Sequence, residues 1–229
     1  MTPPSAALLF QFVIRFVLML IFIGGALFLS AGTLHYWQGW LYLAVSLCAM
    51  TILFTYFIQH DPALLERRFK GHREGETSIV QKTARLAMQL SFLGILVVSG
   101  LDHRFTWSHL PIPIVLAADF LVALSWMIFF FVFRENSFTS SVIEVDQEQR
   151  VVSTGPYRLV RHPLYSGAAL YCLSTSLALG SLWTLLFGLI MVAALLLRLT
   201  DEERFLCLHL PGYTEYRTQT RSRLIPGIF

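Results

Sequence analysis

The sequence predicts an all-α, polytopic integral membrane protein, with four full transmembrane helices followed by a C-terminal helical hairpin and a cytosolic tail. Of its 229 residues, 55% are hydrophobic and only 14% are charged, whereas soluble domains carry about 25% charged residues. Several continuous apolar runs are also long enough to cross a bilayer. Because lipid cannot hydrate backbone amides, and because these runs do not alternate polar and apolar residues, we expect them to be helices.

The four expected spans are 6–29, 39–58, 86–101 and 114–133. The third run is short, so we expect its helix to begin earlier, near Ile79. Asp61-Pro62 predicts a short surface helix over 63–69, since proline is favoured at the first helical position. Two charged residues fall inside the spans. We expect Arg15 to snorkel to the interface. Asp119 is either functional, structurally paired or placed near the interface.

A helical hairpin is expected next in the chain. Pro163 opens an apolar run over 164–179, Gly180-Ser181 interrupts it, and a second run covers 182–197. Each half is close to the minimum length for a span, so the sequence leaves open whether the hairpin crosses the whole bilayer. The charged segment from Arg198 is expected to extend the second helix out of the membrane.

Lys and Arg are concentrated in 59–85, 134–163 and 198–229. Four spans and a returning hairpin place all three segments on one side of the membrane, together with the N-terminus. Basic loops mark the cytoplasmic side, so we expect a multi-pass protein whose active site faces the cytoplasm. The length predicts one domain, 1–229, with the spans in 1–133 and the site in 134–229.

Some chemistries are not expected. Cys48, Cys172 and Cys207 are scattered, which predicts neither a disulfide framework nor a metal site. There is no glycine-rich phosphate loop, and no aromatic and basic pattern that would indicate nucleic acid. The first apolar run is too long, and lacks the basic start, for a cleavable signal peptide.

Residues 155–167 form an unusual polar stretch immediately before an apolar run. Gly155-Pro156 predicts a turn, and Pro163 at a helix start leaves first-turn amides available to a polar ligand. His162 and Tyr165 are three residues apart and share a helix face. The stretch is equally compatible with an interfacial cap, in which arginine and tyrosine lie at headgroup level.

Two further polar pieces are expected on the same side. Arg198 and Glu202 are four residues apart and face the same way, but such a pair on a surface contributes only about 0–1 kcal/mol. The acids 201–203 repel one another unless a cation is near, and a positively charged ligand would supply that cation. Tyr213 and Tyr216 stand one turn apart and either cover a ligand or pack the tail onto the bilayer.

These pieces carry a resemblance to a known family. They read Gly155-Pro156-Tyr157-Arg158-x-x-Arg161-His162-Pro163-Leu164-Tyr165-x-Gly167, and Arg198-x-x-x-Glu202-Glu203-x-x-Leu206 followed by Gly212-Tyr213-x-x-Tyr216. In order and spacing they resemble the cofactor motif of the isoprenylcysteine carboxyl methyltransferase family. The resemblance implies a membrane-embedded methyltransferase that uses S-adenosyl-L-methionine. It also implies that the tail closes a cofactor pocket on the cytosolic face and that a lipophilic substrate enters between helices.

The same resemblance implies roles for individual residues. Arg198 is similar to the arginine that orients the substrate near the methyl group, and Glu202 to the acid that contacts the methionine part of the cofactor; these two are the catalytic candidates. Backbone contacts to the cofactor are implied for 149–152, although Gln149 stands where the eukaryotic pattern has histidine. The candidate cofactor-binding residues are Gln149, Val151, Val152, Tyr157, His162, Pro163, Leu164, Tyr165 and Glu202.

The chemistry of these residue types suits S-adenosylmethionine. A carboxylate such as Glu202 suits its cationic sulfonium and amino groups, His162, Arg158 or Arg161 suits its carboxylate, and tyrosines suit its adenine. A carboxylate acceptor needs only an orienting cation, whereas a thiol or amine acceptor needs a proton acceptor. No metal is required, and the partners expected are the bilayer and a lipophilic or prenylated substrate.

Two other classes of function remain as alternatives. An NADPH-dependent membrane reductase of the sterol type has a similar C-terminal architecture, but it would need more spans and basic residues for the additional phosphate. A non-enzymatic membrane protein would place polar residues in mid-membrane, whereas here they gather at one face. The sequence does not identify the methyl acceptor or the oligomeric state.

Overall fold

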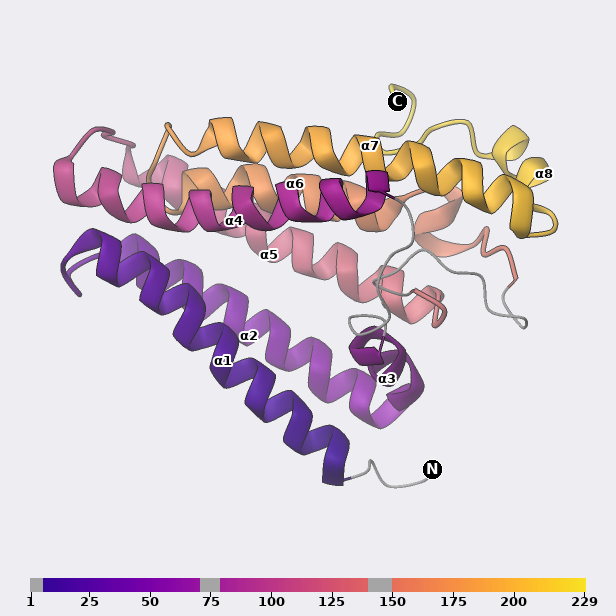
Figure 1. The fold of residues 1–229 in the computed structure, drawn as a ribbon, viewed down its shortest axis with the longest axis horizontal. Coiled ribbons are helices and arrows are strands. Elements are labelled where there is room, and N and C mark those ends of the chain that lie inside the picture. Colours follow the sequence, from indigo (N-terminus) through magenta and orange to yellow (C-terminus); the bar gives the residue numbers. More distant parts are fainter. Residues whose placement is uncertain (1–5, 71–78, 140–149) are drawn as a thin grey trace.

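In the computed structural model, residues 6–70, 79–139 and 150–229 are described, and they contain helices and no strand (Figure 1). The helices are, in order, α1 (Ala6–Ala31), α2 (Trp37–His60), α3 (Pro62–Lys70), α4 (Ile79–Phe105), α5 (Ile112–Glu135), the 3-10 helix η1 (Gly155–Arg158), α6 (Pro163–Ala178), α7 (Leu185–His209) and α8 (Tyr213–Gln219). The all-α prediction is therefore confirmed.

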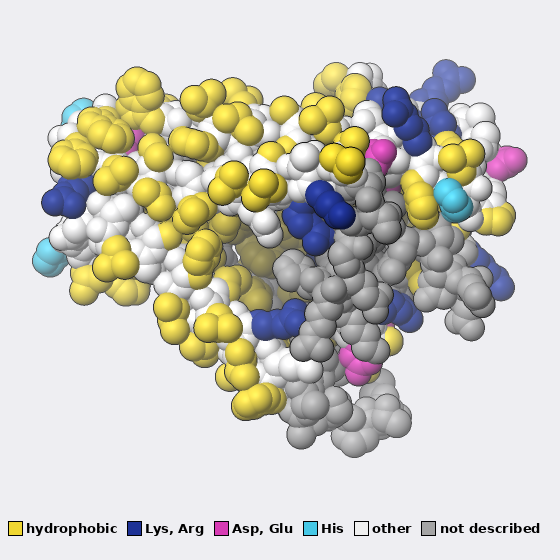
Figure 2. All heavy atoms as spheres, viewed as in Figure 1, with side chains coloured by type: hydrophobic (Ala, Val, Ile, Leu, Met, Phe, Trp, Pro, Cys, Tyr) yellow, Lys and Arg dark blue, Asp and Glu magenta, His cyan; other side chains and the backbone are white. Residues whose placement is uncertain are grey.

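Four helices of the described chain, α1, α2, α4 and α5, are long and apolar enough to cross a membrane. The expected early start of the third span at Ile79 is confirmed, as is the short helix that begins at Pro62. Hydrophobic side chains cover the helical body, whereas most visible Lys and Arg side chains gather toward the end that carries α8 (Figure 2). An outward apolar surface of this kind suits lipid, because hydrocarbon cannot solvate polar groups.

The helices form a bundle in which α5 packs against α6 and α2, and α4 packs against α7 and α1. The α1–α4 crossing is especially close at Gly100. A Cβ atom built there would lie 1.9 Å from Ser30 Oγ and 2.6 Å from the Leu27 carbonyl oxygen. Glycine is thus required at this position by the approach of two backbones.

The hairpin of α6 and α7 reaches the end of the bundle opposite α8. Tyr36, between α1 and α2, donates a hydrogen bond of 2.5 Å to the Leu179 carbonyl. Ser181 Oγ donates to Asp102 near the end of α4, also at 2.5 Å. Since the α1–α2 and α4–α5 connections lie at this end (Figure 1), the hairpin extends along the bundle as far as the full spans do.

The C-terminal tail runs alongside the start of α6. The amides of Arg161 and His162 donate to the carbonyls of Ser222 and Arg223, each at 3.0 Å. Ser166 Oγ donates to the Leu224 carbonyl at 2.7 Å. These bonds join the polar stretch 155–167 to a segment about sixty residues later in the chain. The stretch is therefore packed against the C-terminal tail.

The two charged residues inside the spans differ in their surroundings. Asp119 is 4% exposed, and neither of its carboxyl oxygens has a hydrogen-bond partner among the described residues. Of the alternatives for Asp119, a structural pairing by hydrogen bonds is therefore not seen in the part of the chain that the structure describes. Arg15 is half-buried on α1, and its snorkelling remains a prediction.

Candidate functional site

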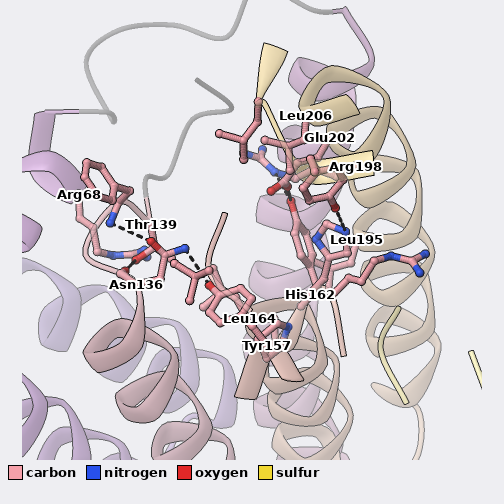
Figure 3. A pocket seen from close by; sticks show the side chains of 18 of the residues that line it. Arg68, Asn136, Thr139, Tyr157, His162, Leu164, Leu195, Arg198, Glu202 and Leu206 are labelled. Carbon is pink, nitrogen blue, oxygen red and sulfur yellow. Dashed lines mark hydrogen bonds between the residues drawn. The ribbon is translucent and has the colours of Figure 1, made fainter. Parts of the chain in front are cut away.

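A cavity of about 510 Å³ lies at the end of the bundle near α8, between α3, α4, η1, α6, α7 and α8 (Figure 3). Every candidate site residue within the described ranges lines it: Val151, Val152, Tyr157, His162, Pro163, Leu164, Tyr165, Arg198 and Glu202. Gln149 lies outside the described residues. The fold therefore brings the two distant motif halves to one cavity, while the role of each residue stays a prediction.

Tyr165 connects the two catalytic candidates. Its hydroxyl donates to Glu202 Oε2 at 2.5 Å and accepts from Arg198 Nε at 3.1 Å. Arg198 and Glu202 are one helical turn apart on α7, and Tyr165 reaches them from the first turn of α6. The expectation that Arg198 and Glu202 face the same way is confirmed, and the tyrosine holds both side chains at the wall of the cavity.

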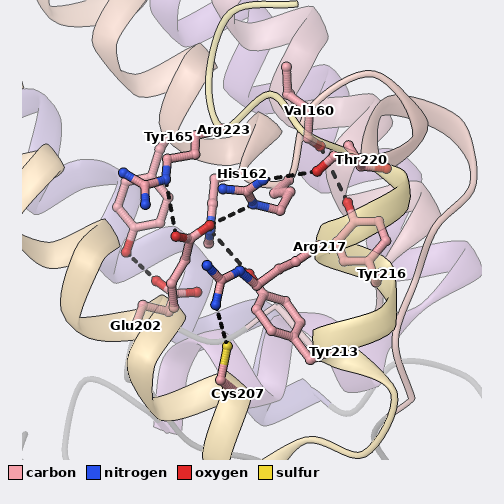
Figure 4. A network of polar contacts seen from close by, with 12 residues as sticks. Val160, His162, Tyr165, Glu202, Cys207, Tyr213, Tyr216, Arg217, Thr220 and Arg223 are labelled. Carbon is pink, nitrogen blue, oxygen red and sulfur yellow. Dashed lines mark hydrogen bonds and ion pairs between the residues drawn. The ribbon is translucent and has the colours of Figure 1, made fainter.

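Glu203, the neighbour of Glu202, is the centre of a buried ionic network. Figure 4 shows this region, with His162 and Arg223 labelled. Glu203 Oε1 accepts from Arg161 Nε at 2.6 Å and lies 3.3 Å from His162 Nε2, and its Oε2 lies 3.1 Å from Arg223 Nε. Burial alone would raise the pKa of this carboxyl, but the hydrogen bonds and charges of His162 and Arg161 outweigh it and lower the pKa to about 2.

The sequence suggested that one cationic ligand would satisfy all three acids 201–203. In the structure, two of them have partners within the protein. Asp201 accepts a hydrogen bond of 2.6 Å from Gln81 Nε2 of α4. Glu203 is paired with Arg161 and Arg223. Only Glu202 lines the cavity, because successive residues of a helix point about 100° apart and these three therefore face three different neighbours.

Two arginines proposed for the cofactor carboxylate have other surroundings. Besides Glu203, Arg161 donates from Nη1 to the Thr220 and Arg221 carbonyls at 2.9 and 2.7 Å. It joins the tail to α6 and α7, and its Nε and Nη1 donors are engaged within the protein. Arg158 is exposed and is not part of the cavity wall. Of the three groups suggested for the carboxylate, Arg161 and His162 line the cavity, and both are also in contact with Glu203.

Three tyrosines form a second part of the wall. Tyr213 and Tyr216 of α8 are each 4% exposed, so they both pack the tail and line the cavity. Tyr216 donates to the Tyr157 carbonyl at 2.7 Å, and Tyr213 lies 3.3 Å from His162 Nε2. Burial raises the pKa of Tyr216 to about 12, which keeps its hydroxyl a neutral donor.

The wall also contains residues that sequence reasoning missed. From α4 and α7 come apolar side chains that lead from the polar end toward the spans: Met88, Phe92, Met191 and Leu195. From α3 and the end of α5 come Arg68 and Asn136. Met191 and Leu195 precede Arg198 on α7 but match no position of the motif. The others belong to elements outside the two motif halves, so only helix packing brings them near.

The arrangement is a cavity with a polar end and an apolar wall. In the described part of the chain there is no group of His, Cys, Asp and Glu side chains that could hold a metal ion. The polar end offers a carboxylate, a guanidinium and tyrosine hydroxyls, and the apolar wall suits a hydrocarbon chain. Such a cavity suits the meeting of a polar ligand and a lipophilic one at the membrane edge.

Comparison with known proteins points in the same direction. Residues 113–209 match the sequence model of the phospholipid methyltransferase family. This range contains nearly all of α5 and the whole of η1, α6 and α7, and therefore both catalytic candidates. A search of curated proteins found no match. The resemblance to isoprenylcysteine carboxyl methyltransferases is confirmed at the level of this wider group of membrane methyltransferases.

Proposed function

Since the family pattern indicates a membrane methyltransferase, we propose that the chain transfers a methyl group from S-adenosyl-L-methionine to a lipophilic, membrane-accessible acceptor. The observation that carries this proposal is the cavity. Arg198, Tyr165 and Glu202, which contact one another, line the same cavity as Met88, Phe92 and other apolar residues. A polar cofactor and a lipid tail could both be accommodated there.

The residues present fit this cofactor. Glu202 offers a half-buried carboxylate on the cavity wall to the cationic end of the molecule. Tyr157, Leu164 and Tyr213 offer aromatic and apolar surface to adenine. When bound, S-adenosylmethionine supplies a methyl group on a sulfonium sulfur, and its transfer leaves S-adenosylhomocysteine.

The protein's part in such a transfer is mainly alignment of the two reactants. Arg198 would orient a carboxylate acceptor and stabilise its charge. Glu202 would accept the proton that a thiol or amine acceptor must lose, with Tyr165 holding the carboxylate in place. The acceptors that fit are an isoprenylcysteine-type carboxylate, a thiol, or the amine of a phospholipid, the last in keeping with the family whose pattern matches.

Binding of the cofactor product is the direct test. Titration calorimetry on purified protein in detergent should show binding of S-adenosylhomocysteine, and Glu202→Gln should weaken it by tenfold or more through loss of the carboxylate. The matched control is NADPH, which a sterol-type reductase would bind. Binding of NADPH in place of S-adenosylhomocysteine would remove the methyltransferase proposal.

The acceptor class needs a separate experiment. Protein in lipid vesicles would be given cofactor with a radiolabelled methyl group and a panel of prenylcysteines, lipophilic thiols and phospholipids. We expect label to appear in one lipid-soluble class. Arg198→Ala should lower turnover more than cofactor affinity; an equal loss of both would argue against an orienting role for Arg198.

A further inference from the structure

The cavity wall is strongly basic. Its arginines are Arg68, Arg85, Arg150, Arg161 and Arg198. Among the described wall residues, the acidic side chain set against them is Glu202. Arg161 is engaged by Glu203 and the tail, so an anionic ligand would be bound by another of these arginines.

Arg68 has the geometry of an anion-binding group. Its guanidinium carbon lies 4.3 Å from the centre of the Phe133 ring, which holds the planar group against α5. Its Nη1 atom is buried and has no hydrogen-bond partner among the described residues. Burial lowers the pKa of Arg68 to about 10, so the side chain is still a cation at neutral pH.

The adjacent arginine behaves differently. Arg67 Nη1 donates to the Ser137 carbonyl at 2.6 Å, and the Arg67 guanidinium carbon lies 4.9 Å from the centre of the Phe138 ring. Arg67 is not part of the cavity wall. Two arginines on the same turn of α3 are thus distinguished by the structure: one is anchored to backbone, and the other turns toward the cavity.

The surroundings of Arg68 supply further polar groups. Asn136 Nδ2 donates to the Tyr157 hydroxyl oxygen at 3.2 Å, and both residues line the same cavity as Arg68. Figure 3 shows Arg68 and Asn136 on one side and Arg198 and Glu202 on the other, with Tyr157 and Leu164 between them. The cavity therefore has a cationic end at α3 and a carboxylate at α7.

We propose that Arg68 binds the anionic oxygen group, a carboxylate or a phosphate, of a ligand in this cavity. A guanidinium nitrogen that is buried with no acid partner among the described residues is costly, and a charge-assisted pair with an anion removes that cost. The assignment rests on the proposed function, which offers two sources of such a group: the carboxylate of the cofactor and the phosphate or carboxylate of the lipid acceptor.

The test compares charged and uncharged ligands on Arg68→Gln and on the control Arg67→Gln. Calorimetry would use S-adenosylhomocysteine against 5′-methylthioadenosine, which lacks the amino acid part, and dihexanoyl phosphatidylethanolamine against dihexanoylglycerol. Arg68→Gln should weaken one charged ligand by about 10- to 100-fold, the usual effect of a charged hydrogen bond. It should leave the uncharged partner of that pair unchanged. Arg67→Gln should bind all four like the parent.

The charged ligand whose binding is weakened identifies the source of the anionic group. Weaker binding of S-adenosylhomocysteine indicates the cofactor carboxylate, and weaker binding of dihexanoyl phosphatidylethanolamine indicates the lipid phosphate. Equal affinity of parent and Arg68→Gln for both charged ligands would overturn the assignment while leaving the proposed function intact. Parent protein that binds neither charged ligand would overturn the proposed function and the assignment together.

Discussion

Adjacent residues of α7 have separate tasks. Glu202 faces the cavity and accepts from Tyr165, whereas Glu203 is 4% exposed and is paired with Arg161 and Arg223. Removing one member of a buried ionic network leaves the others uncompensated, which typically costs about 3–5 kcal/mol. The two carboxylates therefore differ in what their loss should do.

Glu203→Gln should lower the thermal unfolding temperature markedly, because Arg161 and Arg223 would face a neutral amide. Glu202→Gln, its matched control, should unfold close to the parent temperature and lose cofactor affinity instead. Differential scanning fluorimetry in detergent measures the first effect. A Glu203→Gln protein as stable as the parent would show that the network does not hold the tail.

The same carboxyl predicts a dependence on pH. Its pKa is lowered from 4.5 to about 2 in the folded protein, so it binds protons more weakly folded than unfolded. The stability that this shift contributes is present above pH 4.5 and is lost as the pH falls toward 2. The difference in the free energy of unfolding between the parent and Glu203→Gln should narrow over that range. A difference that does not depend on pH would contradict the pairing.

Among the elements, close contacts between distant helices set the shape of the bundle. α1 and α4 approach at Gly100, and the tail runs beside the first turn of α6. These contacts decide where the spans stand relative to the cavity. Gly24, on α1, offers a comparison because no neighbouring atom lies within 4 Å of a Cβ built there.

Gly100→Ala should destabilise the protein by about 1–3 kcal/mol, because the added methyl group overlaps Ser30 and the α1 backbone. Gly24→Ala should be neutral or stabilising, since alanine is the better helix former and the space is open. Thermal unfolding of both variants in detergent checks this. Equal stability of the two alanine variants would mean that α1 and α4 do not approach as described.

The whole molecule is a bundle with one chemically active end. The cavity, α3, α8 and the tail lie at this end, and the turn of the hairpin lies at the other (Figure 1). The described parts of the three basic segments of the sequence fall at the cavity end or in the helices that lead to it. By the distribution of Lys and Arg, we expect this end to face the cytoplasm.

Cysteine labelling tests that orientation. In a variant lacking Cys48, Cys172 and Cys207, a cysteine at the exposed Glu215 should react with an impermeant reagent only from the cytoplasmic side. A cysteine at Thr33, in the α1–α2 connection, should react only from the opposite side. Labelling of both from one side would refute the topology.

The sequence by itself determined the helices, the spans, the presence of the hairpin and the two motif halves that line the cavity. Hydropathy and helical spacing are local properties, so the start at Ile79 and the shared face of Arg198 and Glu202 could be read from neighbouring residues. The polar stretch 155–167 was identified because its residue types are unusual beside an apolar run.

Only the tertiary structure decided what each polar group faces. The orientation of a side chain depends on how its helix is rotated against remote elements, which no spacing encodes. That is why Glu203 turned out to be bound by Arg161 and Arg223 rather than by a ligand, and why Arg68, far from both motif halves, came to line the cavity. The reach of the hairpin was likewise decided by its contacts with Tyr36 and Asp102.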